Sequence, residues 1–449
     1  MIRRLAVSLA GLTLVVSSAV VVPMATFAAA CDPFTTEPVH TGEVENSTTA
    51  VNATLGVDQF TWQQSHDFIA SVDGDSDRVV SGVAATSVEG RALDYAIVGN
   101  PDRVTPEGLA AIRANLQVLR DPLAAPEAVA AAKAATPAIL WLSGNVHGNE
   151  ESGADASLDA LYQLADRSDC VVTNILDNAI VVILPIQNPD GRERNQRRNY
   201  NGFDMNRDWF ARTQPETDGK LELHRQYPPM LYVDAHEFGL SGYFFPPNAD
   251  PEYAEVPDTA HDWINDLYSP AIVDQFNKEN IKFFHGAPYD FFAMIFGDTV
   301  PTTGFHAAGM TFEKQSTADI SVREHEHFTS MWASLAAGAA ARTSILDGWR
   351  ASWVEAYDEG VAGQLEPNNV YEPKHDLYQA VPNVTVRNYF LLNDPARQDE
   401  LQLLVRRLQR MDVIVNQLDA PLDLATFKSY GDPQAAVTLP AGTYWVPMA

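Results

Sequence analysis

The sequence contains few cysteines and few basic residues, and both shortages narrow the possible functions. Only two cysteines occur, Cys31 and Cys170, and neither has a second cysteine at C-x-x-C spacing, so thiolate-rich zinc sites are excluded. Lysine and arginine number 30 against 59 aspartates and glutamates, which gives a formal net charge of -29. This charge repels phosphate backbones and anionic membrane surfaces at long range. We therefore expect no nucleic acid partner.

Two common hydrolase motifs are also absent. No H-E-x-x-H occurs, which argues against thermolysin-like peptidases, and no G-x-S-x-G occurs, which argues against serine hydrolases. The composition is 46% hydrophobic and 20% charged, which is typical of a folded globular protein. At 449 residues the chain exceeds what one hydrophobic core usually serves, so we expect two domains.

The first thirty residues have the pattern of an export signal. Arg3 and Arg4 precede an apolar stretch, and the small residues Ala28-Ala29-Ala30 predict cleavage before Cys31. A retained membrane anchor is an alternative that Pro23 weakens, and a lipid-modified Cys31 is another, for which an alanine at position 28 is a poor match. We expect a signal peptide over residues 1–30, a secreted or extracytoplasmic protein, and no stable membrane contact after signal removal.

The two cysteines allow two interpretations. In an oxidising compartment, a disulfide between Cys31 and Cys170 would tie the mature N-terminus to the main domain. Two unrelated thiols fit the sequence equally well. The segment that follows Cys31, residues 31–55, lacks strong periodicity and is predicted to be an extended leader.

Strand-like and helical patterns alternate through the middle of the chain, which we take as one domain over residues 56–350. The helical spacing of Leu158, Leu161 and Ala165 predicts an amphipathic helix after the first strand. Alternation of this kind predicts an α/β fold, with helices on both faces of a sheet. The predicted strands are the apolar runs at 138–142, 180–184, 230–233 and 310–312.

The last hundred residues predict a linker and a second region. Proline and asparagine cluster in QLEPNNVYEPKHD, within a linker expected over residues 351–384. Residues 385–449 then read as a partial second α/β region, with a strand at 387–392, a helix around residues 401–408 and a second strand at 413–415. The chain stops on PAGTYWVPMA, an apolar strand-like run. Without a partner this strand would expose a sheet edge, so we expect a truncated second region.

Candidate metal ligands stand at the ends of the predicted strands. His147 and Glu150 form an H-x-x-E pair after the first strand, and His236 follows another strand. In α/β sheets, sites form outside the carboxyl ends of strands. Two histidines and one carboxylate leave a fourth zinc position open for water. A solvated loop histidine is the plain alternative for His147, and Glu151 is an alternative ligand that fits better as a first-turn acid of the next helix.

Five motifs in order carry a resemblance to a known family. Over about residues 60 to 345, the chain resembles the zinc metallocarboxypeptidases related to pancreatic carboxypeptidases A and B, as an exported bacterial-type member. This resemblance implies a mixed central sheet with helices on both faces. The motifs are HGNE (147–150), NPDG (188–191), RRNYNGFDMNRDWF (197–210), DAHE (234–237) and MTFEK (310–314).

The resemblance implies a hydrolytic centre. His147, Glu150 and His236 would bind one Zn²⁺ ion. Glu313 would be the general base on zinc-activated water and would then pass the proton to the leaving amine. These roles imply a peptide hydrolase.

The resemblance also implies recognition of a peptide or protein substrate with a free C-terminus. Asn206 and Arg207 would bind its terminal carboxylate, because a guanidinium matches a carboxylate bidentately. Arg197 would polarise the scissile carbonyl, although the adjacent Arg198 leaves the register open by one residue. Tyr289 is the nearest candidate for the family's mobile tyrosine. The side-chain specificity is not apparent from the sequence.

Two further clusters have structural interpretations. His325-Glu326-His327 would place both histidines on one face only in a strand, whereas the surrounding sequence looks helical, so we interpret the group as a surface feature. Four arginines between residues 192 and 198 fit a solvated surface, although they lead directly into Asn206-Arg207.

Three functions fit these observations. The first is an exported zinc carboxypeptidase. The second is a zinc amidohydrolase of the same fold that acts on cell-wall peptides or acyl-amino acids. The third is a non-catalytic binding module that has kept the fold. The Asn206-Arg207 pair favours the first, and an intact set of ligands with Glu313 argues against the third.

Overall fold

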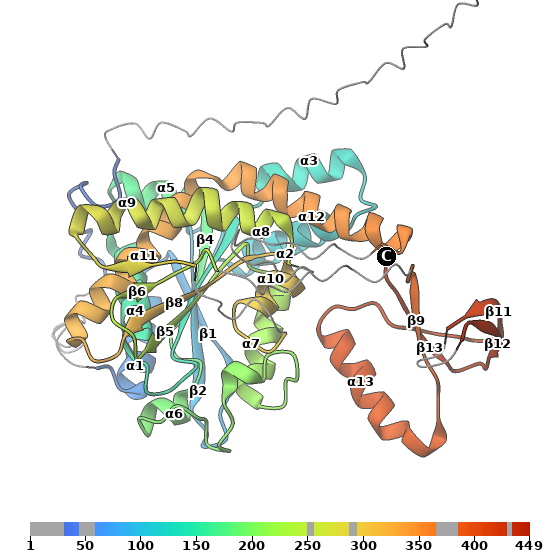
Figure 1. Ribbon diagram of the computed structural model, residues 1–449. Coiled ribbons are helices and arrows are strands. Elements are labelled where there is room, and N and C mark those ends of the chain that lie inside the picture. The colour runs from blue at the N-terminus through green and yellow to red at the C-terminus, as the bar shows by residue number, and fades with distance from the viewer. Residues whose placement is uncertain (1–30, 45–58, 249–255, 287–293, 365–384, 429–432) are drawn as a thin grey trace, which may run out of the picture.

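The computed structural model describes residues 31–44, 59–248, 256–286, 294–364, 385–428 and 433–449. The expected signal peptide, the second part of the leader, most of the expected linker and Tyr289 lie outside these ranges. Figure 1 shows a large α/β body with a small C-terminal region beside it. No helix within the described ranges combines the length and the apolar character needed to cross a bilayer.

The main body is built on an eight-stranded sheet in the order β1-β2-β4-β3-β5-β8-β6-β7. The central strands β4, β3, β5 and β8 run parallel, whereas β1–β2, β2–β4 and β6–β8 pair antiparallel. The four runs predicted as strands lie in these central strands, so the prediction of a mixed central sheet is confirmed. The bounds are β1 (Val79–Thr86), β2 (Ala92–Val98), β3 (Ala138–Gly144), β4 (Ala179–Leu184), β5 (Leu231–Phe238), β6 (Tyr243–Phe244), β7 (Phe283–Phe284) and β8 (Ala308–Gln315).

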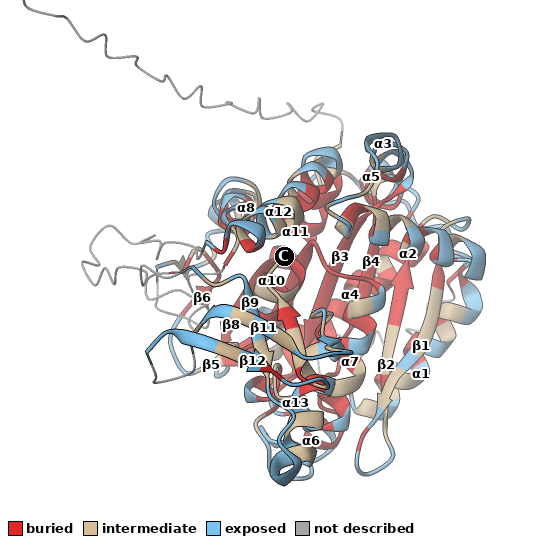
Figure 2. Ribbon diagram, turned by 90° about the vertical axis from the view of Figure 1, so that its right-hand side faces the viewer, coloured by how far each residue is buried: buried red, intermediate tan, exposed pale blue. Residues whose placement is uncertain are grey.

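Helices cover both faces of this sheet. Every residue of β3 and β4 is buried, and because successive side chains of a strand point to opposite faces, both faces must be covered. Figure 2 shows these buried strands at the centre of the body. The helices are α1 (Trp62–Asp75), α2 (Pro106–Arg120), α3 (Pro126–Ala135), α4 (Ser152–Asp166), α5 (Cys170–Asn178), α6 (Pro189–Glu193), α7 (Pro215–Gln226), α8 (Asp258–Trp263), α9 (Ser269–Glu279), α10 (Thr299–Phe305), α11 (Ile320–Ala340) and α12 (Arg342–Ala362), with short segments η2 (Met205–Arg207) and η3 (Ile264–Tyr268).

Helix α12 corrects the start of the expected linker. The linker was expected from residue 351, but the helix continues to Ala362. Residues 351–362 contain no proline, and Gly363 follows with a φ of 71°. A glycine in this left-handed conformation is a common end signal for a helix, so the helix ends there and not at the change in composition.

The N-terminal segment is fastened to the main body. Cys31 and Cys170 form a disulfide, which decides between the two interpretations of the cysteines. Further along the segment, His40 and Thr41 both contact the carboxylate of Asp166 at 2.8 Å. Residues 31–44 contain neither a helix nor a strand longer than one bridge, as expected for an extended leader.

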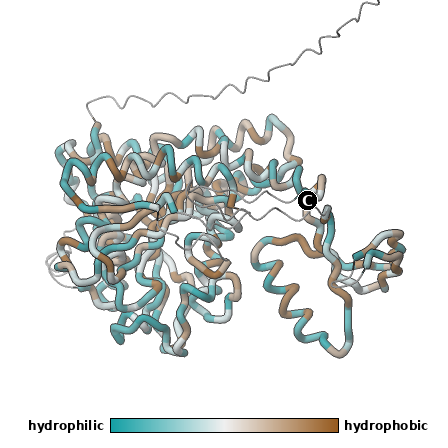
Figure 3. Tube along the Cα trace, in the orientation of Figure 1, coloured by the Kyte–Doolittle hydropathy of each residue, from teal (hydrophilic) through white to brown (hydrophobic). Residues whose placement is uncertain are grey.

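The C-terminal region forms two small sheets and one helix. Strand β9 (Asn388–Leu391), the short segment η4 (Pro395–Arg397) and helix α13 (Gln398–Arg410) agree with the first two predicted elements. Figure 3 shows hydrophobic and hydrophilic residues alternating along α13, as in an amphipathic helix. The remaining strands are β10 (Asn416–Gln417), β11 (Leu422–Phe427), β12 (Ala435–Leu439) and β13 (Tyr444–Pro447).

One predicted strand of this region is misplaced, and the assumption that the final strand lacks partners is wrong. The second strand is β10 at residues 416–417 and not 413–415. Residues 411–413 contact the main body instead: Met411 and Val413 pack against its core, and Asp412 accepts from Arg120 and Arg225. The final strand also has partners, because β13 pairs with β10 on one side and β9 on the other. It therefore exposes no edge.

Buried histidines predict that the protein loses stability in acid. Burial lowers the pKa of His224, His306 and His327 to about 3 in each case. In the unfolded chain these histidines bind protons below about pH 6.5, whereas in the folded protein they stay neutral down to about pH 3. The free energy of unfolding is therefore highest above pH 6.5 and falls as the pH is lowered towards 3. We expect each histidine to cost roughly 2 kcal/mol of unfolding free energy at pH 5. Urea unfolding at pH 7 and pH 5 measures the difference.

His306→Asn tests one of these contributions. His306 has a φ of 59°, a conformation that asparagine tolerates better than most residues. The variant should lose less stability than the parent between pH 7 and pH 5. An equal loss in both proteins would contradict the assignment of this pH dependence to His306.

Candidate metal centre and active site

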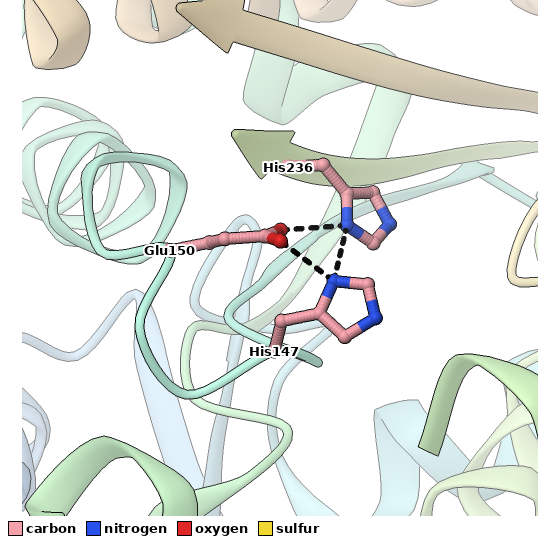
Figure 4. Close-up of side chains that lie close together, drawn as sticks. All are labelled: His147, Glu150 and His236. Carbon is pink, nitrogen blue, oxygen red and sulfur yellow. Dashed lines mark hydrogen bonds and ion pairs between the residues drawn. The ribbon is translucent and has the colours of Figure 1, made fainter. Parts of the chain in front are cut away.

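The predicted ligands meet at the carboxyl ends of neighbouring parallel strands. His147 and Glu150 lie in the turn after β3, and His236 lies near the end of β5. Glu313 lies on β8 directly beside His236 in the strand register. Figure 4 shows the side chains of His147, Glu150 and His236 pointing toward one another. The parallel arrangement of the sheet therefore brings together residues that are far apart in the sequence.

The turn that carries the first two ligands has a defined shape. Asn145 adopts a φ of 55°, and its Nδ2 donates to the carbonyls of His147 at 3.0 Å and Glu150 at 2.8 Å. Gly148 lies against residues 191–192, where an added Cβ would come within 2.0 Å of the Gly191 carbonyl carbon. Glycine is therefore required at that position, and the asparagine holds the two ligand residues in register.

The donor atoms of this cluster fit a zinc ion. Their ligand atoms all lie within 4.8 Å of one another. Nδ1 of His147 is 3.3 Å from Nδ1 of His236, and the Glu150 carboxylate is 2.8 Å from the first and 2.9 Å from the second. Zn–N bonds of about 2.0–2.1 Å in a tetrahedron place two nitrogens about 3.3 Å apart. Two imidazoles and one carboxylate are also the ligands of catalytic zinc sites.

A carboxylate holds the far nitrogen of each histidine. Nε2 of His147 is 3.1 Å from Asp204, and Nε2 of His236 is 3.0 Å from Asp234. Because an ionised carboxylate only accepts, each ring donates from Nε2, and Nδ1 is the nitrogen that faces the cluster and would bind a metal. Burial raises the pKa of both carboxyls, but hydrogen bonds and charge from the histidines outweigh it and lower both pKa values. Both carboxylates were missed from the sequence, although Asp234 lies two residues before His236, on the same face of the strand.

The charged state of His236 follows from these neighbours. Burial alone would lower its pKa, but Asp234 and Glu150 raise it well above the usual value. Burial likewise opposes ionisation of Glu150, whereas His147 and His236 lower its pKa to about 2. The cluster therefore keeps Glu150 ionised, as a metal ligand must be.

A cavity of about 360 Å³ opens over the cluster. It is lined by the predicted ligands and by most of the other predicted site residues. Both Arg197 and Arg207 line it, so two guanidinium groups face a site that also contains the Glu313 side chain. The lining residues are His147, Asn149, Glu150, Arg197, Asn206, Arg207, His236, Glu237, Phe238, Gly239, Glu313 and Ser316.

The structure separates the two adjacent arginines. Arg197 donates to Glu150 at 3.2 Å and to Asp204 at 3.0 and 3.1 Å. Arg198 donates to the carbonyl of Gly202 at 2.8 Å and does not line the cavity. Of the two adjacent arginines between which the sequence could not decide, Arg197 is therefore the one that lines the cavity. Of the other two arginines, Arg192 is buried, so the cluster is not simply a solvated surface.

Asn206 and Arg207 lie together in η2, beside the ligands. The Asn206 side-chain oxygen accepts from Trp209 at 3.0 Å and from the Gly297 amide at 2.8 Å, which fixes the amide orientation. The Arg207 guanidinium lies 4.5 Å from the centre of the Phe296 ring and donates to the Asn206 carbonyl at 2.7 Å. Both side chains are therefore held in place before any ligand arrives.

The buried side chains around α11 correct one prediction. His325 is exposed and contacts Glu279, but Glu326 is buried against Lys314 at 2.6 Å. His327 is completely buried and lies 3.2 Å from the carbonyl of His236. The HEH group is therefore not a surface feature. Positions two apart on a helix point in nearly opposite directions, so His325 faces solvent and His327 faces the backbone of β5.

The glutamate that follows the ligand pair lies at the N-terminus of the next helix and not among the ligands, in agreement with the preferred interpretation. Glu151 is not among the clustered donor atoms. It is the N-cap residue of α4, and its side chain is buried 3.3 Å from Arg323. The same Arg323 binds Glu237, which accepts from Ser152. Glu151 thus belongs to a buried ion cluster behind the site, while Glu150 faces the cavity.

Comparison with known proteins identifies a domain in the first two thirds of the chain. Residues 66–282 match the model of the zinc carboxypeptidase family, Peptidase_M14. A probable carboxypeptidase 2 of Trichophyton verrucosum is 36% identical over 115 residues, which cover 26% of this chain and 22% of that protein. Human carboxypeptidase D is 32% identical over 168 residues, which cover 32% of this chain and 12% of that protein. The match thus spans about a fifth of the fungal relative's length.

Solved structures were also compared. Carboxypeptidase A from Helicoverpa armigera aligns with a TM-score of 0.46 and 17% identity, covering 67% of this chain and 80% of that one. A metallo-carboxypeptidase from Burkholderia cenocepacia aligns with a TM-score of 0.46 and 14% identity, covering 62% and 69%. The family match over residues 66–282 and the curated relatives show that this chain carries a zinc carboxypeptidase domain.

Proposed function

We propose that the protein is an exported, zinc-dependent metallocarboxypeptidase that removes C-terminal residues from peptides or proteins. The observation that carries this proposal is one cavity that contains three metal-ligand side chains, a buried glutamate and two arginines. The ligand set accounts for hydrolysis, and the arginines account for recognition of a free carboxylate. The disulfide between Cys31 and Cys170 supports export, because such bonds persist in oxidising compartments.

Zinc bound by His147, Glu150 and His236 would supply a Lewis acid that polarises the scissile carbonyl and acidifies water. Glu313 is 3% exposed and lines the same cavity, so its carboxylate is placed to take a proton from water and give it to the leaving amine. Arg197 supplies a fixed cation for the developing oxyanion. These groups together perform the hydrolytic step.

The direction of cleavage follows from Arg207 and Asn206, which line the same cavity. Arg207 is a cation held by Phe296, and the fixed amide of Asn206 directs its Nδ2 away from Trp209 and Gly297. A guanidinium and an amide N–H are donors that suit a terminal carboxylate. A substrate anchored there would present its last peptide bond to the metal centre.

A panel of substrates tests the proposal. Peptides with free C-termini, the same peptides amidated, and cell-wall peptides are incubated with the full chain, with and without a zinc chelator. We expect rapid release of the terminal residue from the free peptides and at least about 100-fold slower cleavage of the amidated ones, because the anchoring charge is lost. The chelator should abolish cleavage.

Each other outcome identifies another function. Equal rates of cleavage of the free and the amidated peptides would contradict the carboxypeptidase proposal. Preference for the cell-wall peptides would favour the amidohydrolase, and tight peptide binding without cleavage in the presence of zinc would favour a binding module.

A further inference from the structure

A completely buried lysine lies behind the metal centre. Lys220 on α7 has no exposed surface, and its Nζ lies 3.5 Å from the centre of the Trp209 ring. Burial lowers the pKa of this lysine to about 7, although Asp234, Asp208 and Glu216 oppose the shift. Burying an ammonium group costs free energy unless its partners compensate. The hydrogen-bond partners of Lys220 must therefore offset the cost of burying its ammonium group.

The lysine is joined to a metal ligand by a chain of hydrogen bonds. Nζ of Lys220 donates to Oε1 of Gln187 at 2.7 Å, and Nε2 of Gln187 donates to Oδ1 of Asp234 at 2.9 Å. The other oxygen of Asp234 lies 3.0 Å from Nε2 of His236. His236 in turn directs Nδ1 at Glu150. These hydrogen bonds thus connect α7 through β5 to the metal cluster.

The donor and acceptor of each of these hydrogen bonds are fixed by the groups involved. In its ammonium form, Lys220 can only donate, so it faces the amide oxygen of Gln187. The amide NH₂ group then faces Asp234 and occupies one of its oxygens. The remaining oxygen accepts from Nε2 of His236, so Nδ1 is the nitrogen of that ring that would bind the metal after releasing any proton it carries.

Packing confines the same carboxylate. Gly297 lies so close that an added Cβ would be 1.9 Å from Oδ2 of Asp234 and 3.0 Å from the Trp209 ring. Asp234 is therefore held by contact on one side and by Gln187 on the other. Its position depends on both.

We propose that Lys220 and Gln187 are positioning residues for the metal centre, which hold Asp234 so that His236 presents the correct nitrogen to zinc. This inference rests on the proposed zinc site and goes beyond it, because neither residue touches the metal ligands. A purely structural lysine would affect the stability of the fold but not zinc affinity at equal stability.

Lys220→Met tests the inference, because methionine keeps the apolar stem and removes the donor. We expect zinc affinity of the full chain, measured by competition with a chromophoric chelator, to fall about 10- to 100-fold. Urea unfolding of the metal-free protein measures stability separately, because the variant removes a buried charge but also leaves the Gln187 oxygen without its donor. Lys133→Met is the matched control: Lys133 pairs with Asp347 at the surface, at 2.5 Å, and its loss should leave zinc affinity unchanged.

Gln187→Met provides a second variant. It should lower zinc affinity by a similar factor, and the double variant should be little worse than either single one, because residues in series are not additive. Unchanged affinity in both single variants, with a parent that binds one zinc, overturns this inference alone. Loss of affinity that only accompanies loss of metal-free stability also overturns it. A parent that binds no zinc overturns the proposed function as well.

Discussion

Glu313→Gln should retain bound zinc and lose most of its turnover. Glu313 is buried, lines the cavity and lies beside His236 in the strand register, but it is not one of the clustered metal ligands. Glutamine has the same size but cannot accept and carry a proton at neutral pH. We expect kcat to fall about 1,000-fold or more, within the 10²–10⁴ range of general acid–base catalysis. Peptide hydrolysis and zinc content are measured on the same preparation.

Glu151→Gln is the control for this variant. Glu151 is also a buried glutamate near the centre, but it contacts Arg323 behind the site and does not line the cavity. Its replacement should leave kcat within a few-fold of the parent. If Glu313→Gln cleaves peptides at the parent rate, the general-base assignment is wrong. If it has lost zinc, Glu313 has a role in metal binding that the geometry does not give it.

The parts of the site that could be predicted are those fixed by local pattern. Apolar runs identified the central strands, and polar residues at the ends of such runs meet at one edge of a parallel sheet. That rule is sufficient to group His147, Glu150 and His236, whose side chains the structure brings together. Family motifs then added Glu313 and the arginines. None of these steps requires knowledge of a side-chain conformation.

The parts that could not be predicted depend on tertiary contacts. Arg197 and Arg198 are adjacent and chemically identical, so only the fold shows which one faces Glu150. Lys220 lies in a helix of largely polar sequence, PETDGKLELHRQ, which gives no sign that this residue is buried. In the C-terminal region, Met411 and Val413 have the apolar character of strand residues, but they pack against the core of the main body instead of forming a strand. Burial against a distant surface overrides local propensity in each case.

Arg197→Met should lower kcat about 100- to 1,000-fold, while the equivalent change at the next residue should have little effect. The Arg197 guanidinium is held between Glu150 and Asp204 at the rim of the metal cluster. A cation fixed there stabilises charge that develops on the substrate oxygen only in the transition state, so kcat and kcat/KM should fall together. Steady-state kinetics on a peptide with a free C-terminus measure both constants.

Arg198→Met is a close control, because it removes the same charge from a neighbouring position that donates only to the Gly202 carbonyl and lies outside the cavity lining. Both variants change the net charge of the protein equally, so a general electrostatic effect would lower the two rates alike. A large fall in kcat for Arg198→Met with none for Arg197→Met would show that Arg198 has the role assigned to Arg197. Loss of zinc from Arg197→Met alone would show instead that its main role is to hold Glu150 and Asp204 in place around the metal.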